Sequence, residues 1–71
     1  MEIITLRDEF IKLGQALKAS GMAGNGVEAK FLIQDGLVKV NGCVEERRGR
    51  KLYAGDVVEY AGNQIKIEES I

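Results

Sequence analysis

Histidine is absent from this 71-residue sequence, and cysteine occurs once, as Cys43. Without histidine, the chain lacks the side chain that most often acts as a general base near neutral pH. One cysteine can neither close an internal disulfide nor build a metal site alone, so a reducing cytoplasm is the expected compartment. A thiolate nucleophile would need a base or an oriented positive charge beside it, and the sequence pattern supplies neither. We therefore predict no enzymatic activity and no cofactor.

Proline and long apolar runs are also missing. No stretch of about 18 apolar residues could cross a membrane. The first residues show no basic segment followed by an apolar stretch, as a secretory signal would. The piece Gly24-Asn25-Gly26 lacks the further glycine and the preceding strand of a dinucleotide-binding loop. We expect residues 1–71 to form one small, monomeric domain with no membrane partner.

Glycine and asparagine divide the chain into periodic segments. Apolar residues at helical spacing predict a first short helix over residues 13–20, with Gly21 as its left-handed stop. Asn25 and Glu28 form a capping pair that predicts the start of a second helix, which ends before Gly36. The connection between the two helices is short, so we expect them to pack as a pair.

The later part of the chain has the period of β-strands. Val38 and Val40 alternate with other residues, and Asn41-Gly42 supplies the two positive φ angles of a type I′ hairpin. Further strand segments are predicted at residues 43–46, 52–53, 57–60 and 65–67, and residues 3–6 are a candidate edge strand. A helix pair followed by antiparallel strands predicts an α+β fold.

Four of the five residues from Arg47 to Lys51 are cationic, although the chain has a formal net charge of −1. The run lies between a predicted hairpin and a strand, which would fix its direction, and a fixed cationic ridge suits a phosphate backbone. A solvated turn is the alternative. Residues 12–51 hold eight Lys or Arg against four Asp or Glu, a net +4. This imbalance favours a basic face, unless folding intermingles the segments.

Three motifs occur in a specific order after the helix pair. They are Gly36-Leu37-Val38-Lys39-Val40-Asn41-Gly42, Arg47-Arg48-Gly49-Arg50-Lys51-Leu52-Tyr53 and Gly55-Asp56-Val57-Val58. With them, residues 13–59 resemble the S4 RNA-binding domain, most closely the small free-standing bacterial S4-domain proteins. The resemblance implies an S4-like (αL) fold, with two packed short helices followed by an antiparallel sheet. It also implies a non-catalytic module that binds the backbone of structured RNA, such as ribosomal RNA, its precursors or tRNA-like RNA, and that can associate with ribosomal particles.

The resemblance also indicates where RNA would bind. Many S4 domains carry an arginine just after the N-cap of the second helix, and here Gly26 takes that position. Gly26 offers only a backbone N–H at the helix N-terminus, so more of the binding falls to the basic run. We expect that run to share a face with the first turn of the second helix. The candidate RNA-binding residues are Asn25, Gly26, Lys30, Gln34, Lys39, Arg47, Arg48, Arg50 and Lys51.

Several of these side chains also have a structural interpretation. Lys30 either flanks the binding face or covers the apolar stripe with its stem. Asn25 and Gln34 also fit an N-cap and a helix surface. Lys18 is better explained as a partner of the first helix dipole than as an RNA contact. Tyr53 could stack on a base, although a position at the edge of the core is the commoner role.

Two other functions fit the sequence less well. A DNA-binding helix pair would place residues 25–35 in a major groove, but that segment has one cation, Lys30, and brings Glu28 and Asp35 toward phosphate. The other alternative is a protein-interaction domain with an acidic partner.

Overall fold

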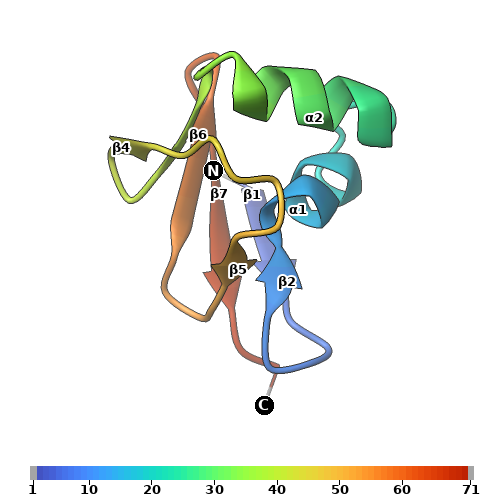
Figure 1. Cartoon of the computed structure of the whole chain (residues 1–71). Helices are drawn as coiled ribbons and strands as arrows, with labels where there is room; N and C mark the ends of the chain where they lie inside the picture. The colour runs from blue at the N-terminus through green and yellow to red at the C-terminus, as the bar shows by residue number, and fades with distance from the viewer. Residues whose placement is uncertain (1, 71) are drawn as a thin grey trace.

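The computed structural model describes residues 2–70, which form two helices, a five-stranded sheet and a two-stranded ribbon (Figure 1). The strand order in the larger sheet is β1-β7-β6-β3-β4, and β2 pairs with β5 in the ribbon. The elements are β1 (Glu2–Thr5), β2 (Ile11–Lys12), α1 (Leu13–Ala19), α2 (Gly26–Gln34), β3 (Val38–Val40), β4 (Cys43–Val44), β5 (Lys51–Leu52), β6 (Val57–Tyr60) and β7 (Asn63–Glu68). The α+β class predicted from the sequence is confirmed.

Two strands precede the helix pair, so the predicted order of helices first and strands afterwards was incomplete. The candidate edge strand at residues 3–6 is confirmed as β1, which pairs in parallel with β7, while the other pairs in that sheet are antiparallel. Strand β2 is only two residues long and exists because it pairs with β5, about forty positions later. So short a strand has no readable alternation, which is why the sequence pattern missed it.

The Asn25–Glu28 cap and the two glycine stops that the sequence predicts are present, and α1 has a further cap that it did not predict. The backbone N–H of Lys12 donates to Gln15 Oε1 (3.2 Å) at the start of α1, and Asn25 Oδ1 accepts from the Glu28 N–H (2.8 Å) at the start of α2. The chain leaves the helices through Gly21 (φ 81°) and Gly36 (φ 75°), in the left-handed region that glycine adopts without a steric cost. The observed boundaries, Leu13–Ala19 and Gly26–Gln34, agree with the predicted ones to within a residue or two.

Strand β4 is shorter than predicted. The Asn41-Gly42 turn has both positive φ angles of a type I′ hairpin (52° and 85°), as expected. The returning strand ends at Val44, however, and not at residue 46. The Glu45 N–H still donates to the Val38 carbonyl (3.0 Å), but the Glu45 carboxylate turns inward to bind two arginines. These ion pairs direct the chain away from the sheet.

One hydrophobic core joins the helices to the sheet and the ribbon. Its buried members are Leu6, Leu13, Ala16, Leu17, Ala23, Ala29, Ile33, Val38, Val40, Leu52, Val58, Ile65 and Ile67. Leu13 and Leu17 project from α1, and Val38 and Val40 from β3, as their spacing predicts. Within residues 2–70, no helix has the length and apolar character needed to span a membrane.

Candidate nucleic-acid interface

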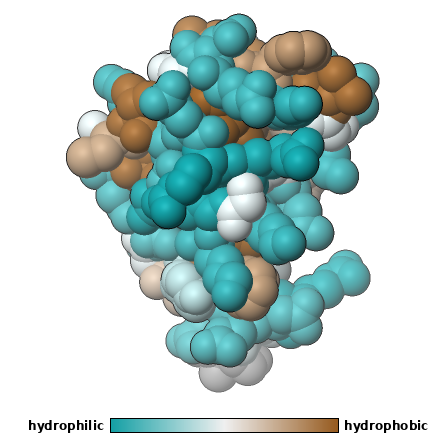
Figure 2. Space-filling model, viewed as in Figure 1, coloured by the Kyte–Doolittle hydropathy of each residue, from teal (hydrophilic) through white to brown (hydrophobic). Residues whose placement is uncertain are grey.

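A hollow whose lining includes four positive side chains, beside the exposed apolar side chains Val27 and Phe31, lies between α1, α2 and the loop that joins β4 to β5. We call it the cationic hollow. It is lined by Lys12, Gly14, Gln15, Lys18, Asn25, Gly26, Val27, Glu28, Ala29, Lys30, Phe31, Leu32, Arg48 and Gly49. Its lining holds four cations and one carboxylate, that of Glu28, which leaves three net positive charges. Figure 2 shows hydrophilic side chains across the middle of this side of the molecule, with hydrophobic ones above them.

The N-terminus of α2 opens into the cationic hollow. Asn25 caps the Glu28 N–H, and the remaining backbone N–H groups of the first turn lie close to Gly26. Unpaired N–H groups and the helix dipole both favour an anion at this position. Steric crowding does not require glycine at position 26, because a Cβ atom there would have no neighbour within 4 Å. The end of α2 therefore adds a partial positive charge to the hollow.

Arg48 reaches the hollow by crossing the first turn of α1 at Gly14. The Gly14 N–H donates to the Arg48 carbonyl (3.1 Å), and a Cβ atom at Gly14 would lie 2.9 Å from Arg48 Cγ. The neighbouring Leu13 N–H donates to the Arg50 carbonyl (2.8 Å), so two backbone bonds fasten the loop to α1. Gly14 lowers the intrinsic helix propensity of α1, but it gives Arg48 the space to lie against the helix.

Glu45 holds the other side of the same loop. Its carboxylate accepts four hydrogen bonds, three from the backbone N–H and guanidinium of Arg47 and one from Arg50 (2.9–3.1 Å). These bonds, above all those from the Arg47 side chain, lower the pKa of Glu45 to about 2. Burial alone would raise that pKa, but its effect is smaller. The same pair raises the pKa of Arg47. Glu45 is only 7% exposed, so this network stabilises the loop from inside.

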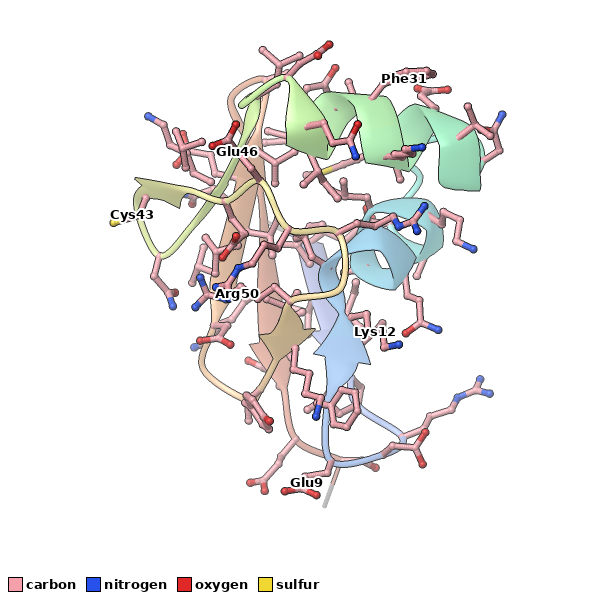
Figure 3. All side chains as sticks on the ribbon, in the orientation of Figure 1. Glu9, Lys12, Phe31, Cys43, Glu46 and Arg50 are labelled. Carbon is pink, nitrogen blue, oxygen red and sulfur yellow. The ribbon has the colours of Figure 1, made fainter. Side chains whose placement is uncertain are left out.

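The cationic run therefore divides among three environments. Of its four cations, Arg48 alone lines the cationic hollow. Arg47 and Arg50 bind Glu45, although the Arg47 side chain remains 77% exposed. Lys51 lies on β5 with its Nζ 4.8 Å from the centre of the Phe10 ring. In Figure 3, Lys12 and Arg50 project to either side of β5.

The other predicted residues separate in the same way. Asn25, Gly26 and Lys30 line the hollow, whereas Gln34 and Lys39 do not. Gln34 is exposed on the last turn of α2, and Lys39 points outward from β3 between two buried valines. The structure thus brings four of the nine predicted residues together at the start of α2.

Lys12, Gln15 and Lys18 are lining residues that sequence reasoning missed or assigned elsewhere. Lys18 had been interpreted as a partner of the helix dipole, but its side chain also lines the cationic hollow. The three positions are spaced three apart, opposite the buried face that Leu13 and Leu17 form. This polar stripe could have indicated a binding surface on α1. The sequence did not show, however, that the loop between β4 and β5 lies beside it.

The geometry suits the binding of an extended anion. Cations from three separate chain segments converge with a helix N-terminus on one open surface. Within residues 2–70, no cluster of three or more His, Cys, Asp or Glu side chains is placed to hold a metal ion. The surface can neutralise phosphates, and its amide and backbone groups can donate to neighbouring oxygens.

Comparison with known proteins agrees with this architecture. Residues 4–68 match the model of the S4 domain family, a longer stretch than the 13–59 on which the sequence resemblance was based. The chain is 46% identical over 59 residues to the Bacillus subtilis (strain 168) protein named "Probable ribosome maturation protein RlbA", covering 83% of each chain. It is 39% identical over 57 residues to the Escherichia coli (strain K12) protein named "Putative RNA-binding protein YbcJ", covering 80% of this chain and 81% of that protein.

The solved structures include the same E. coli relative. The solution structure of YbcJ superposes with a TM-score of 0.73 at 35% identity, covering 96% of this chain and 87% of that chain, and is described as revealing an αL motif involved in RNA binding. The matching part includes both helices, the ribbon and the sheet that frame the cationic hollow. On this sequence and structural evidence, the chain belongs to the S4 domain family.

Proposed function

We propose that this protein is a non-catalytic RNA-binding module that holds the backbone of structured RNA in the cationic hollow. One observation carries the proposal: Lys12, Lys18, Lys30 and Arg48, from separate parts of the chain, line the same hollow as the N-terminus of α2. Four cations gathered beside a helix end repel one another unless an anion lies between them. A phosphate backbone supplies a row of such anions at regular spacing.

RNA fits this surface better than DNA does. The α2 helix contributes one cation and places Glu28 in its first turn, which would oppose its insertion into a major groove. The hollow is formed by α1 and a loop as well as α2, so it suits the shape of a folded RNA backbone. The 2′-hydroxyls of that backbone can accept and donate hydrogen bonds. The names of the relatives in B. subtilis and E. coli support RNA as the ligand class.

Ribosomal RNA or one of its precursors is the RNA that we infer. The support is the 46% identity to a protein named for ribosome maturation. This role would place the protein in the cytoplasm, bound to ribosomal particles or to their precursors.

The salt dependence of binding tests the proposal most directly. If about four cations neutralise phosphates, log affinity should fall with log salt at a slope of roughly −3 to −4. Replacing Lys12, Lys18 and Arg48 together by serine should flatten that slope by two to three units, by roughly one for each cation removed. Lys39→Ser and Lys66→Ser, which remove cations outside the hollow, serve as matched controls and should leave the slope almost unchanged.

Competitors in the same titration separate the three candidate functions. Folded RNA should displace a labelled RNA hairpin at lower concentration than double-stranded DNA or an acidic peptide does, at one fixed salt concentration. An unchanged slope in the triple variant, or stronger competition by the DNA or the peptide, would contradict the proposal.

A further inference from the structure

The outward face of the β2–β5 ribbon carries four side chains that the core does not use. The register pairs Ile11 with Leu52 and Lys12 with Lys51. Leu52 is fully buried and Ile11 packs against the core, so strand alternation directs the two lysines outward. Phe10 precedes Ile11 and Tyr53 follows Leu52, so both lie one position beyond the paired residues. Their ring centres lie 6.1 Å apart at an interplanar angle of 53°. A lysine pair thus lies beside an aromatic pair.

Tyr53 is exposed and held in place, and Phe10 beside it is half-buried. Tyr53 is 45% exposed, although it adjoins a fully buried leucine. Its backbone N–H donates to Asp56 Oδ2 (2.8 Å), which ties the residue to the turn that follows. Tilted rings at this separation support each other's orientation. Nearly half of the Tyr53 surface therefore meets solvent, at a position fixed by the Asp56 bond and the Phe10 ring.

Lys12 and Lys51 lie directly opposite each other on the paired strands. Like charges directly opposite each other on paired strands are destabilising. Among the described residues neither ammonium has an ion-pair partner, and the Lys51 Nζ lies over the Phe10 ring. An anion lying between the two side chains would relieve their repulsion. Lys12 also lines the cationic hollow, so the ribbon continues that surface.

We propose that the ribbon is a second nucleotide site, which binds an unpaired nucleotide of the RNA held in the hollow. A phosphate lies between Lys12 and Lys51, and the attached base stacks on Tyr53. The base must be unpaired because bases within a duplex are stacked on one another and do not present a face to a side chain. This inference rests on the proposed function and adds a preference for RNA in which a paired segment continues into a single-stranded one.

Two RNAs and two variants test the site. One RNA is a blunt hairpin, and the other is the same hairpin with a short single-stranded extension. Tyr53→Leu keeps an apolar side chain but removes the ring, and it should weaken binding of the extended hairpin by about tenfold. It should leave the blunt hairpin almost unaffected. Tyr53→Phe keeps the stacking surface and should bind both RNAs as the unmodified protein does.

A spectroscopic readout covers the case in which Tyr53→Leu fails to fold. The chain has two tyrosines, so Tyr60→Phe leaves Tyr53 as the only one. Its ring protons should shift upfield in the NMR spectrum when the extended hairpin is added, and not when the blunt hairpin is added. If Tyr53→Leu lost affinity equally for both RNAs, or if the Tyr53 ring protons did not shift, the stacking site alone would be overturned. Failure of the unmodified protein to bind either RNA would overturn the proposed function as well.

Discussion

The two sides of the loop between β4 and β5 use the same type of side chain differently. On the inner side, Arg47 and Arg50 donate to the carboxylate of Glu45, which is almost fully buried. On the outer side, Arg48 crosses Gly14 and lines the cationic hollow, with no ion-pair partner among residues 2–70. The inner arginines satisfy a buried charge, whereas the outer one remains available to a ligand. Proximity in sequence therefore does not give these arginines one role.

The largest expected effect is on stability, at the inner side. Glu45→Gln removes the charge that Arg47 and Arg50 bind, and it should lower the free energy of unfolding by roughly 2 kcal/mol, the scale of hydrogen bonds to charged groups. Urea denaturation followed by circular dichroism measures this. Glu46→Gln removes a neighbouring charge that has no ion pair among the described residues, and it is the matched control. Equal stability of the two variants would mean that the network contributes nothing.

Acid should remove the same contribution. Glu45 has a pKa of about 2 in the folded protein, below its ordinary value of 4.5. A lowered carboxylate pKa stabilises the folded state above the unfolded pKa, and the benefit is lost as pH falls through the folded pKa. The stability difference between the unmodified protein and Glu45→Gln should thus be full above about pH 5 and shrink toward pH 2. A difference that stays constant over that range would contradict the assignment.

Arg48→Ala should weaken RNA binding and leave stability nearly unchanged, the opposite of Glu45→Gln. It removes one hollow cation and should weaken folded-RNA binding by about fivefold to tenfold and flatten the salt slope by about one unit. Its melting temperature should stay close to that of the unmodified protein, because Arg48 pairs with no buried charge. Arg47→Ala, with a mainly stabilising role, should lower the melting temperature more and the affinity less. Identical profiles for the two variants would erase the distinction between the two sides of the loop.

Gly14→Ala tests whether the outer arginine depends on the glycine beneath it. The added methyl group would lie 2.9 Å from Arg48 Cγ, so the arginine must move, and RNA affinity should fall by about threefold to fivefold, part of the loss expected for Arg48→Ala. Alanine favours helix over glycine, so a general loss of α1 is not expected. In an Arg48→Ala background the clash is gone, and Gly14→Ala should have no further effect on affinity. An additive loss in the double variant would contradict the dependence.

The smallest expected effect is a gain at the start of α2. Gly26→Arg would add the cation that many S4 domains carry there, in a position with open space around it. Affinity for folded RNA should rise by about threefold, with the salt slope steeper by about one unit. Gly26→Gln, which adds a side chain without a charge, is the control. Weaker binding of Gly26→Arg than of Gly26→Gln would show that phosphate does not approach this helix end.

Much of the fold was predictable because its signals are local. Asn25 and Glu28 define the start of α2 through a bond between near neighbours, and Gly21 and Gly36 end the helices through their own backbone angles. Asn41-Gly42 similarly determines its turn. The alternating valines place one face of β3 in the core, because side chains on a strand alternate between its two faces. The order of these motifs was also enough to indicate the S4 family.

Only the tertiary structure decided which charges share a surface. Lys12 and Lys18 join Arg48 because two backbone hydrogen bonds fasten the loop against α1, more than thirty residues earlier in the chain. Arg47 and Arg50 turn away because Glu45 is buried beneath them, and burial depends on the packing of the whole sheet. The sequence by itself determined that this chain has a basic segment beside a capped helix. Contacts between distant residues determined which of those cations face solvent and which bind a carboxylate, since charge in a sequence carries no direction until the chain folds.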